Sequence, residues 1–152
     1  STIQEECGVW GAGPVAFAQE PDAAIAIDVT HATDFPGVEK KRFGDIRLGR
    51  GPVAHRGVKS SKVLTRAFLE TAERYGIPLQ IEAEGGRYGT DADPMAASRA
   101  GVPVNTLSVP LRYMHTAVET ACLEDLDNTV FLLTQTLLGL DPAQDLRAFP
   151  FA

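Results

Sequence analysis

Residues 23–29, with the sequence AAIAIDV, are apolar at every position except Asp28. A nearly unbroken apolar run of this length is typical of a strand that is buried on both faces of a sheet. We therefore expect residues 23–29 to form a central strand. Two further runs, residues 79–83 (LQIEA) and residues 105–109 (NTLSV), predict shorter strands.

Two helices are indicated by apolar residues at helical spacing. The first follows Ser60 and Ser61, either of which can cap it, and ends at Gly76 before Pro78. Its apolar stripe consists of Val63, Leu64, Ala67, Phe68, Thr71, Ala72 and Tyr75. The second covers residues 124–138, and its apolar stripe consists of Leu123, Leu126, Val130, Leu133 and Leu137. We expect each stripe to face the core.

The remaining segments have weaker patterns. Residues 91–99 predict a third helix, and residues 2–4 are expected to form a strand at the start of the chain. Residues 33–58 are rich in glycine, proline and charge, so they predict loops with a short strand at residues 45–48. Because strands alternate with helices, the fold class is α/β, with a sheet flanked by helices.

Composition excludes several classes of protein. The chain has 152 residues, enough for one ordinary domain, and its formal net charge of −6 does not favour binding to nucleic-acid phosphates. No apolar run approaches the roughly 20 residues that a membrane-spanning helix needs. Cys7 and Cys122 match no metal-binding spacing, so we expect them to be buried and unpaired, as in a reducing compartment such as the cytoplasm.

Polar residues at the ends of the apolar runs mark a candidate site, because reactive groups of α/β proteins gather where strands end. They are Glu5 and Glu6 after residues 2–4, Asp28 near the end of its run, and His115 after the last predicted strand. Carboxylates with an imidazole suit zinc, cobalt or manganese. Since neighbours on a strand point to opposite sides, one glutamate could bind metal while the other acts as general base.

Each of these positions also has an ordinary explanation. Paired glutamates are commonly a solvated strand end, Asp28 could cap the next turn, and His115 could bond a backbone carbonyl. His31 and His55 are expected in loops without a chemical role. One at a time, the ordinary explanation is favoured for each residue, whereas the set together favours a site.

Two glycine-rich segments give weaker signals. Residues 11–16 (GAGPVA) match a relaxed dinucleotide-binding pattern, but Pro14 and the lack of a preceding apolar strand indicate an accidental match. Residues 85–91 (GGRYGTD) could cradle an anion, but no Gly-Lys-Ser/Thr follows. A tight turn capped by Thr90 or Asp91 is the simpler interpretation.

Several spaced motifs resemble those of the tetrahedral (TET-type) metallo-aminopeptidases, the M42 family of the zinc-exopeptidase clan, also called glutamyl aminopeptidases or endoglucanases. The matching segments are residues 4–8 (QEECG), 26–32 (AIDVTHA), 48–52 (LGRGP), 89–93 (GTDAD), 110–115 (PLRYMH) and 125–128 (DLDN). Their order and intervals fit over residues 1–140, which makes the resemblance specific. It implies a three-layer, zinc-exopeptidase-like α/β sheet flanked by helices and incomplete on its N-terminal side.

The resemblance also implies a role for each candidate residue. Glu5 is similar to the general base of the family, Glu6 and His115 to ligands of one divalent ion, and Asp28 to a ligand of a second. The ions would be zinc or cobalt, with manganese as an alternative. The residues that resemble the lining of the peptide-substrate cleft are Thr90, Asp91 and Arg112. The implied activity is hydrolysis of N-terminal residues from peptides.

The family's catalytic domain is larger than this chain, carries an inserted dimerisation domain and has a histidine and a metal-bridging aspartate upstream of the Gln-Glu-Glu motif. We therefore expect residues 1–152 to be the C-terminal portion of one metallopeptidase catalytic domain, homo-oligomeric when complete. The first alternative is a non-catalytic fragment or assembly module. A glycosidase, suggested by the pair Glu5 and Glu6, is the third choice. It ranks last because adjacent residues of a strand point to opposite sides, whereas the two carboxylates of a glycosidase flank one bond.

Overall fold

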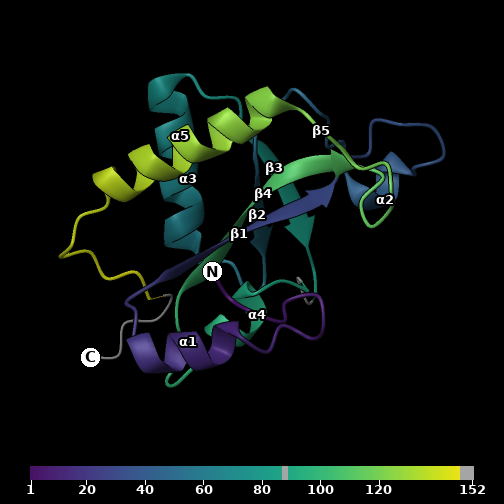
Figure 1. The fold of residues 1–152 in the computed structure, drawn as a ribbon. Helices are drawn as coiled ribbons and strands as arrows, with labels where there is room; N and C mark the ends of the chain where they lie inside the picture. The colour runs from purple at the N-terminus through teal and green to yellow at the C-terminus, as the bar shows by residue number, and fades with distance from the viewer. Residues whose placement is uncertain (87–88, 148–152) are drawn as a thin grey trace.

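A mixed sheet with helices on both faces forms the centre of the computed structural model, which describes residues 1–86 and 89–147 (Figure 1). The strands are β1 (Ala24–His31), β2 (Val53–Gly57), β3 (Gln80–Glu84), β4 (Val104–Arg112) and β5 (Thr120–Ala121). The order across the sheet is β1-β4-β2-β3, and β5 pairs with β4. β1 is parallel to β4, and β2 is parallel to β3, whereas β2 and β4 are antiparallel.

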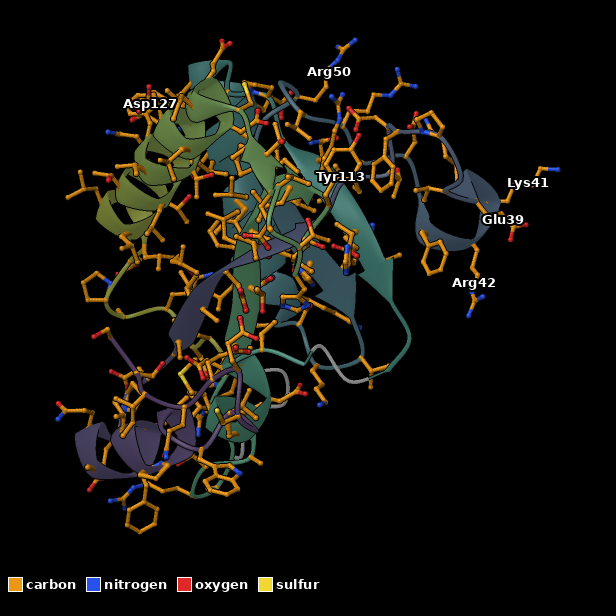
Figure 2. The ribbon with its side chains drawn as sticks, turned by 45° about the vertical axis from the view of Figure 1, so that its right-hand side comes forward. Glu39, Lys41, Arg42, Arg50, Tyr113 and Asp127 are labelled. Atoms are coloured by element: carbon orange, nitrogen blue, oxygen red, sulfur yellow. The ribbon has the colours of Figure 1, made fainter. Side chains whose placement is uncertain are left out.

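The helices are α1 (Ala12–Gln19), α2 (Lys40–Phe43), α3 (Lys62–Tyr75), α4 (Ala92–Ala96) and α5 (Leu123–Gly139). In Figure 1, α3 and α5 lie together above the strands, and α1 and α4 lie at the opposite side. α2 belongs to a projecting loop, from which Glu39, Lys41 and Arg42 point away from the body (Figure 2). No helix of the described residues is long and apolar enough to cross a membrane.

Two apolar clusters hold the helices to the sheet. On one face, Leu107 of β4 packs with Phe68 of α3 and Leu132 of α5. On the other face, Val104 of β4 and Ala26 of β1 pack with Ala92 of α4. Because successive strand residues point to opposite faces, odd-numbered residues of β4 face α3 and α5, and even-numbered residues face α4. The expected α/β architecture is confirmed.

The central strand of the described sheet is β4, not β1. Residues 104–111 are all buried, whereas β1 pairs with β4 alone among the described residues and leaves Ile27 and Val29 exposed. The expectation of a central strand at residues 23–29 is therefore wrong for this part of the chain. The apolar composition of a strand indicates whether its two faces favour burial. It does not indicate whether both of its edges pair with other strands.

The loop region and the first residues also differ from expectation. β2 occupies Val53–Gly57, where loops were predicted, so His55 lies buried on a strand, and residues 45–48 form no strand. Residues 2–4 form no strand either. The backbone turns there, with Gly8 N and Val9 N both donating to Glu5 O at 3.1 and 2.8 Å. Short segments of this kind take their conformation from tertiary partners rather than from their own pattern.

The helices match the predictions in different degrees. α3 begins as predicted, with Leu64 N donating to Ser61 Oγ at 3.3 Å, and ends at Gly76 in the left-handed region (φ 66°). α4 is shorter than the predicted 91–99. α1 was not predicted, and it accepts Pro14 because first-turn amides need no partner within the helix. Turns rather than a strand precede it, in agreement with an accidental dinucleotide motif.

α5 lies where it was predicted but buries a different face. Its buried residues are Asp125, Thr129, Leu132 and Thr136. Of the predicted stripe, Leu133 packs against the core as expected, whereas Leu123, Leu126, Val130 and Leu137 are exposed. The Asp125 carboxylate, which accepts from Gly49 N and Gly51 N at 2.7 Å each, fixes this rotation. Both cysteines are free as expected, but neither is buried, because Cys7 is exposed and Cys122 is half-buried.

Candidate active site

A cavity of about 260 Å³ lies beside the carboxyl-terminal half of β1 and the loop that follows β4. Since these two strands are parallel, their carboxyl ends meet at the same edge, where ligand sites of α/β proteins form. The ionisable side chains that line the cavity are Glu5, Glu6, Asp28, His31, His55, Glu82 and His115. The four residues predicted to carry the chemistry, Glu5, Glu6, Asp28 and His115, thus line one cavity.

The turn after β4 brings His115 next to Glu6. The two side chains approach with His115 Nε2 3.5 Å from Glu6 Oε2, and both are exposed. Tyr113 and His115 have left-handed backbone conformations (φ 60° and 63°), which are uncommon for residues other than glycine. His115 N donates to Glu119 Oε1 at 2.6 Å, and this bond helps to hold the turn. A strained backbone at this point is typical of a segment shaped for function.

Glu5 and Glu6 both line the cavity, although they are neighbours in sequence. The argument that they point to opposite sides assumed a strand. The chain forms a turn at these residues instead, and Gln4 and Val9 have left-handed backbone conformations (φ 61° and 53°). The turn therefore allows both carboxylates to reach the same space, and the strand-based argument is wrong.

Crowded carboxylates shift the proton affinities in the cavity. Burial raises the pKa of Glu5, and the negative charges of Asp28, Glu6 and Asp91 raise it further. The pKa of Asp28 is also raised, mainly by burial, although its Oδ1 accepts from Val29 N at 2.8 Å. The described lining residues include no lysine or arginine. The cavity is therefore a negatively charged environment that a cation would stabilise.

His55 and Glu82 form a polar floor that the sequence interpretation missed. They face each other on β2 and β3, with His55 Nε2 3.7 Å from Glu82 Oε2 and 3.0 Å from Ser108 Oγ. Thr30 Oγ1 donates to Glu82 Oε2 at 2.6 Å. The alternation of Gln80 and Glu82 with apolar residues was only a weak indication that Glu82 faces a functional site. His55 lies next to Glu82 because the register of β2 and β3 pairs the two residues, and the sequence does not indicate this register.

The three predicted substrate-binding residues occupy different places. Thr90 is buried in the cavity wall, where its Oγ1 accepts from Ala92 N at 3.2 Å. Asp91 accepts a hydrogen bond from the Thr2 hydroxyl, and its buried Oδ1 has no partner among the described residues. Arg112 is not part of the cavity lining, because its guanidinium forms a two-bond pair with Asp34 at 2.8 Å each.

The donor set fits a divalent cation in kind but is short in number. Carboxylate oxygen and imidazole nitrogen are suitable ligands for zinc, cobalt or manganese. Glu6 and His115 form a close pair, with Asp28 and Glu5 in the same cavity. Within residues 1–86 and 89–147, however, no three His, Cys, Asp or Glu side chains are grouped closely enough to hold an ion.

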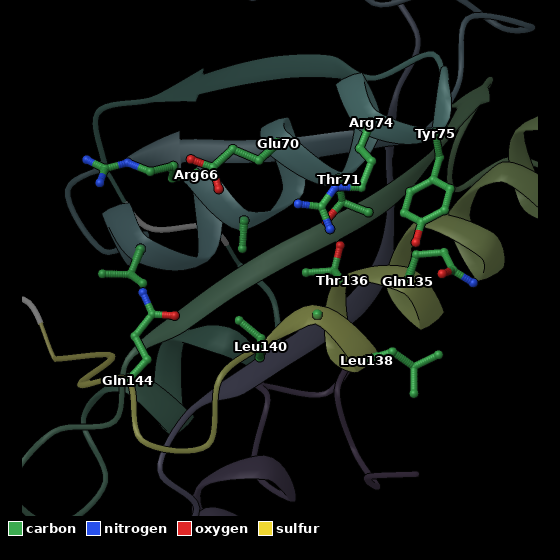
Figure 3. A pocket seen from close by; sticks show the side chains of 13 residues that line it. Arg66, Glu70, Thr71, Arg74, Tyr75, Gln135, Thr136, Leu138, Leu140 and Gln144 are labelled. Carbon is green, nitrogen blue, oxygen red and sulfur yellow. The ribbon is translucent and has the colours of Figure 1, made fainter.

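A second cavity, of about 310 Å³, lies between α3 and α5 (Figure 3). Arg66, Arg74, Gln135 and Gln144 project into this region, and Glu70 is the single carboxylate among its described lining residues. A guanidinium-rich and amide-rich wall does not suit a metal ion. The acidic cavity is therefore the better candidate for an active site.

Comparisons with known proteins identify the family to which the chain is similar. The sequence profile of the family described as M42 glutamyl aminopeptidase matches residues 1–132. A lysyl aminopeptidase of Pyrococcus furiosus is 41% identical over 142 residues, which cover 93% of this chain and 40% of that protein. The chain therefore spans less than half the length of this relative.

Solved structures give the same result. An aminopeptidase from the archaeon Desulfurococcus kamchatkensis has a TM-score of 0.85 and 36% identity, covering 93% of this chain and 41% of that one. A TET aminopeptidase from a marine sediment Thaumarchaeota archaeon has a TM-score of 0.85 and 30% identity, with coverage of 93% and 40%. These likenesses confirm the predicted zinc-exopeptidase type of α/β fold. The chain belongs to the M42 family of glutamyl aminopeptidases.

Proposed function

We propose that residues 1–152 are the C-terminal portion of the catalytic domain of a metal-dependent aminopeptidase, which removes N-terminal residues from peptides. The observation that carries this proposal is the acidic cavity, in which Glu5, Glu6, Asp28 and His115 of an M42 family member come together. The negative cavity favours a free α-ammonium group over a blocked one, as an aminopeptidase requires.

In this proposal, Glu6 and His115 hold one divalent ion and Asp28 holds a second. The ions, zinc or cobalt with manganese as the alternative, would polarise the peptide carbonyl and stabilise the charge that develops on its oxygen. A tight site normally has three or four protein ligands, so the remaining ligands would come from the part of the protein outside this chain. The upstream catalytic half and an inserted dimerisation domain would belong to that part.

Glu5 is proposed as the general base. It accepts a proton from the attacking water as the oxygen adds to the carbonyl carbon, and it delivers a proton to the amine that leaves when the C–N bond breaks. Its place in the cavity beside Glu6 and His115 supports this role. Thr90 is proposed to contact the peptide at the cavity wall, and a substrate contact for Asp91, which is not among the lining residues, stays a prediction. A substrate contact for Arg112 stays a prediction.

Replacing Glu5 by glutamine in the complete protein tests the assignment. We expect turnover of an amino-acid anilide to fall by at least about 10²-fold, because the amide cannot accept the proton, while the metal content per chain stays unchanged. The matched control is Glu39→Gln on the projecting loop, which should leave both quantities as they are. Undiminished turnover in Glu5→Gln would exclude Glu5 as the base.

The alternative is a non-catalytic assembly module, and the shortage of metal ligands among the described residues favours it for the isolated chain. The aminopeptidase and the assembly-module hypotheses predict different activities for residues 1–152 alone. We expect purified 1–152 with added zinc or cobalt to release no product from a leucine or lysine anilide. Measurable turnover by this chain would exclude the hypothesis of a non-catalytic module. A glycosidase remains the third choice. Homo-oligomeric assembly remains a proposal that rests on the family resemblance, and cytoplasmic location remains one that rests on the unpaired cysteines.

A further inference from the structure

The cavity of about 310 Å³ between α3 and α5 (the α3–α5 cavity) is lined by charges of both signs. α3 carries Arg66, Glu70 and Arg74 at intervals of four residues, so the three side chains lie on one side of the helix. A glutamate commonly pairs with an arginine four residues later. Within residues 1–86 and 89–147, however, none of these three side chains takes part in an ion pair or a hydrogen bond. Each of them is therefore available to a ligand.

The α5 side of the same cavity carries a hydroxyl group without a partner. Thr136 is 1% exposed, and its buried Oγ1 has no hydrogen bond to any described residue. Buried hydroxyl groups are normally hydrogen-bonded, as in Thr134 of the same helix, whose Oγ1 donates to Val130 O at 2.7 Å. Figure 3 shows the Thr136 hydroxyl turned toward α3 and the guanidinium of Arg74. The unpaired hydroxyl indicates a polar ligand between the two helices.

Aliphatic side chains complete the wall of the cavity. They are Val63 and Ala67 of α3, Leu138 of α5, and Leu140 directly after α5. Leu138 is 77% exposed, so an aliphatic group that packs on it removes apolar surface from water. The volume is at the lower end of the range for small-molecule sites. A ligand that fits is therefore small and has a positive, a negative and an aliphatic group.

We propose that the α3–α5 cavity, with Glu70, Arg74, Thr136, Leu138 and Leu140 as its ligand-binding residues, binds a free α-amino acid with an aliphatic side chain. Arg74 donates two parallel hydrogen bonds to the α-carboxylate, as guanidinium groups commonly do. Glu70 accepts from the α-ammonium group, and the Thr136 hydroxyl donates to a carboxylate oxygen. The aliphatic side chain packs on the two leucines.

Two simpler ligands fit less well. An inorganic anion can bind Arg74, but it brings negative charge close to Glu70, and like charges repel. A residue inside a peptide has neither a free α-ammonium nor a free α-carboxylate group, so it pairs with neither side chain. A free amino acid carries both charges on one carbon atom.

The α3–α5 cavity and the acidic cavity have no lining residue in common in the part of the chain that the structure describes. An aminopeptidase releases free α-amino acids, so the ligand is a product of the reaction that binds at a second site. This link to the reaction rests on the proposed function, whereas the charges and the unpaired hydroxyl do not depend on it.

Equilibrium dialysis of radiolabelled L-leucine against the complete protein tests the site. We expect Arg74→Gln to bind about one leucine per chain fewer than the parent, because the neutral amide loses the charge-assisted hydrogen bonds to the carboxylate. The matched control is Arg50→Gln, an exposed position before β2 that lines neither cavity (Figure 2) and should bind as much leucine as the parent. Equal binding by Arg74→Gln and the parent would overturn the proposal, whether or not the protein is an active aminopeptidase.

Thr136→Val separates a role in binding from a role in folding. Valine has nearly the shape of threonine and lacks only the hydroxyl group. We expect leucine to bind at least about 5-fold more weakly, because one hydrogen bond is lost. The melting temperature without leucine should not fall, because the hydroxyl has no partner in the fold. An unchanged affinity for leucine would contradict the proposal.

Two leucine analogues identify the ligand class. L-Leucinol lacks the carboxylate, and 4-methylpentanoate lacks the ammonium group. We expect each to displace labelled leucine from the Arg74-dependent site at least about 10-fold less well than unlabelled leucine does, because each loses one charged contact. Equal displacement by 4-methylpentanoate or by inorganic phosphate would show a general anion site and would overturn the proposal.

Discussion

At the scale of single residues, the buried carboxylate of Asp125 connects α5 to the loop before β2. It accepts from Gly49 N and Gly51 N, and Gly51 cannot be replaced because its φ is 85° and a Cβ there would lie 1.9 Å from Pro78 O. The LGRGP segment and the start of α5 therefore form one unit. This contact determines which face of α5 is buried.

Asp125→Asn should destabilise the protein by about 2–4 kcal/mol, because the side-chain amide presents N–H groups to two backbone N–H donors in a buried place. Urea unfolding at pH 7 measures the change. The matched control is Asp127→Asn, two residues along α5, where the side chain points to solvent (Figure 2) and the effect should stay within about 0.5 kcal/mol. Equal small effects of both substitutions would contradict this account.

The pair between Arg112 and Asp34 gives a pH-dependent contribution. Hydrogen bonding by Arg112 lowers the pKa of Asp34 below its usual range, so the pair stabilises the fold at pH values above the unfolded pKa of about 3.9. As the pH falls through the lowered folded-state pKa, Asp34 binds a proton and the contribution is lost.

Arg112→Leu should therefore lower the free energy of unfolding modestly at pH 5–7, because the guanidinium is partly exposed and water screens the pair. The difference between the variant and the parent should shrink as the pH falls below about 4. Denaturant unfolding at pH 7, 5 and 3 checks this. A difference that grows in acid would show that Asp34 is not the partner that matters.

At the scale of elements, the caps of α3 were readable because they are local. Ser61 accepts from Leu64 N, and Gly76 ends the helix in a left-handed conformation. Ser61→Ala should lower the free energy of unfolding by about 1 kcal/mol, and Ser61→Asp should retain most of it, because aspartate caps equally well. Thermal unfolding of the two variants provides the measurement, and equal losses would attribute the effect to the buried position rather than to the cap.

Also at this scale, β1 does not take the central place expected for it among the described strands. Residues 23–29 have the more continuous apolar sequence, yet β4, like β2, has a neighbour on each side, whereas β1 pairs with β4 alone. β4 includes buried polar residues, such as Asn105, whose Nδ2 donates to Thr65 Oγ1 at 2.7 Å. A pattern that penalises polar residues misses a central strand whose polar groups are paired across the fold.

At the scale of the whole molecule, the acidic cavity combines segments that are far apart in the sequence. Glu5 and Glu6 come from the first turn, and His115 comes from the loop after β4. The negative charges of Glu5, Glu6 and Asp28 repel one another, so a bound cation should stabilise the folded state. In the complete protein, chelation of divalent ions should lower the melting temperature by several degrees, and Glu6→Gln with His115→Ala should reduce that shift.

Differential scanning calorimetry with and without chelator measures both shifts. The Glu39→Gln variant on the projecting loop is the control, since it lies far from the cavity and should keep the full shift. A full chelator-dependent shift in the double variant would place the ions elsewhere in the protein.

The sequence alone predicted the α/β class, the bounds of α3 and α5 to within a residue or two, and four of the residues that line the acidic cavity. Caps and helical periodicity are local properties, and the spaced motifs could be recognised from their order. Only the tertiary structure decided the strand order, the turn at Glu5 and Glu6, the buried pair of His55 and Glu82, and the face of α5 that is buried. These depend on which segments become neighbours. The Asp125 carboxylate, bound by two distant backbone amides, turns its own face of α5 inward, and most of the predicted apolar stripe is left exposed among the described residues.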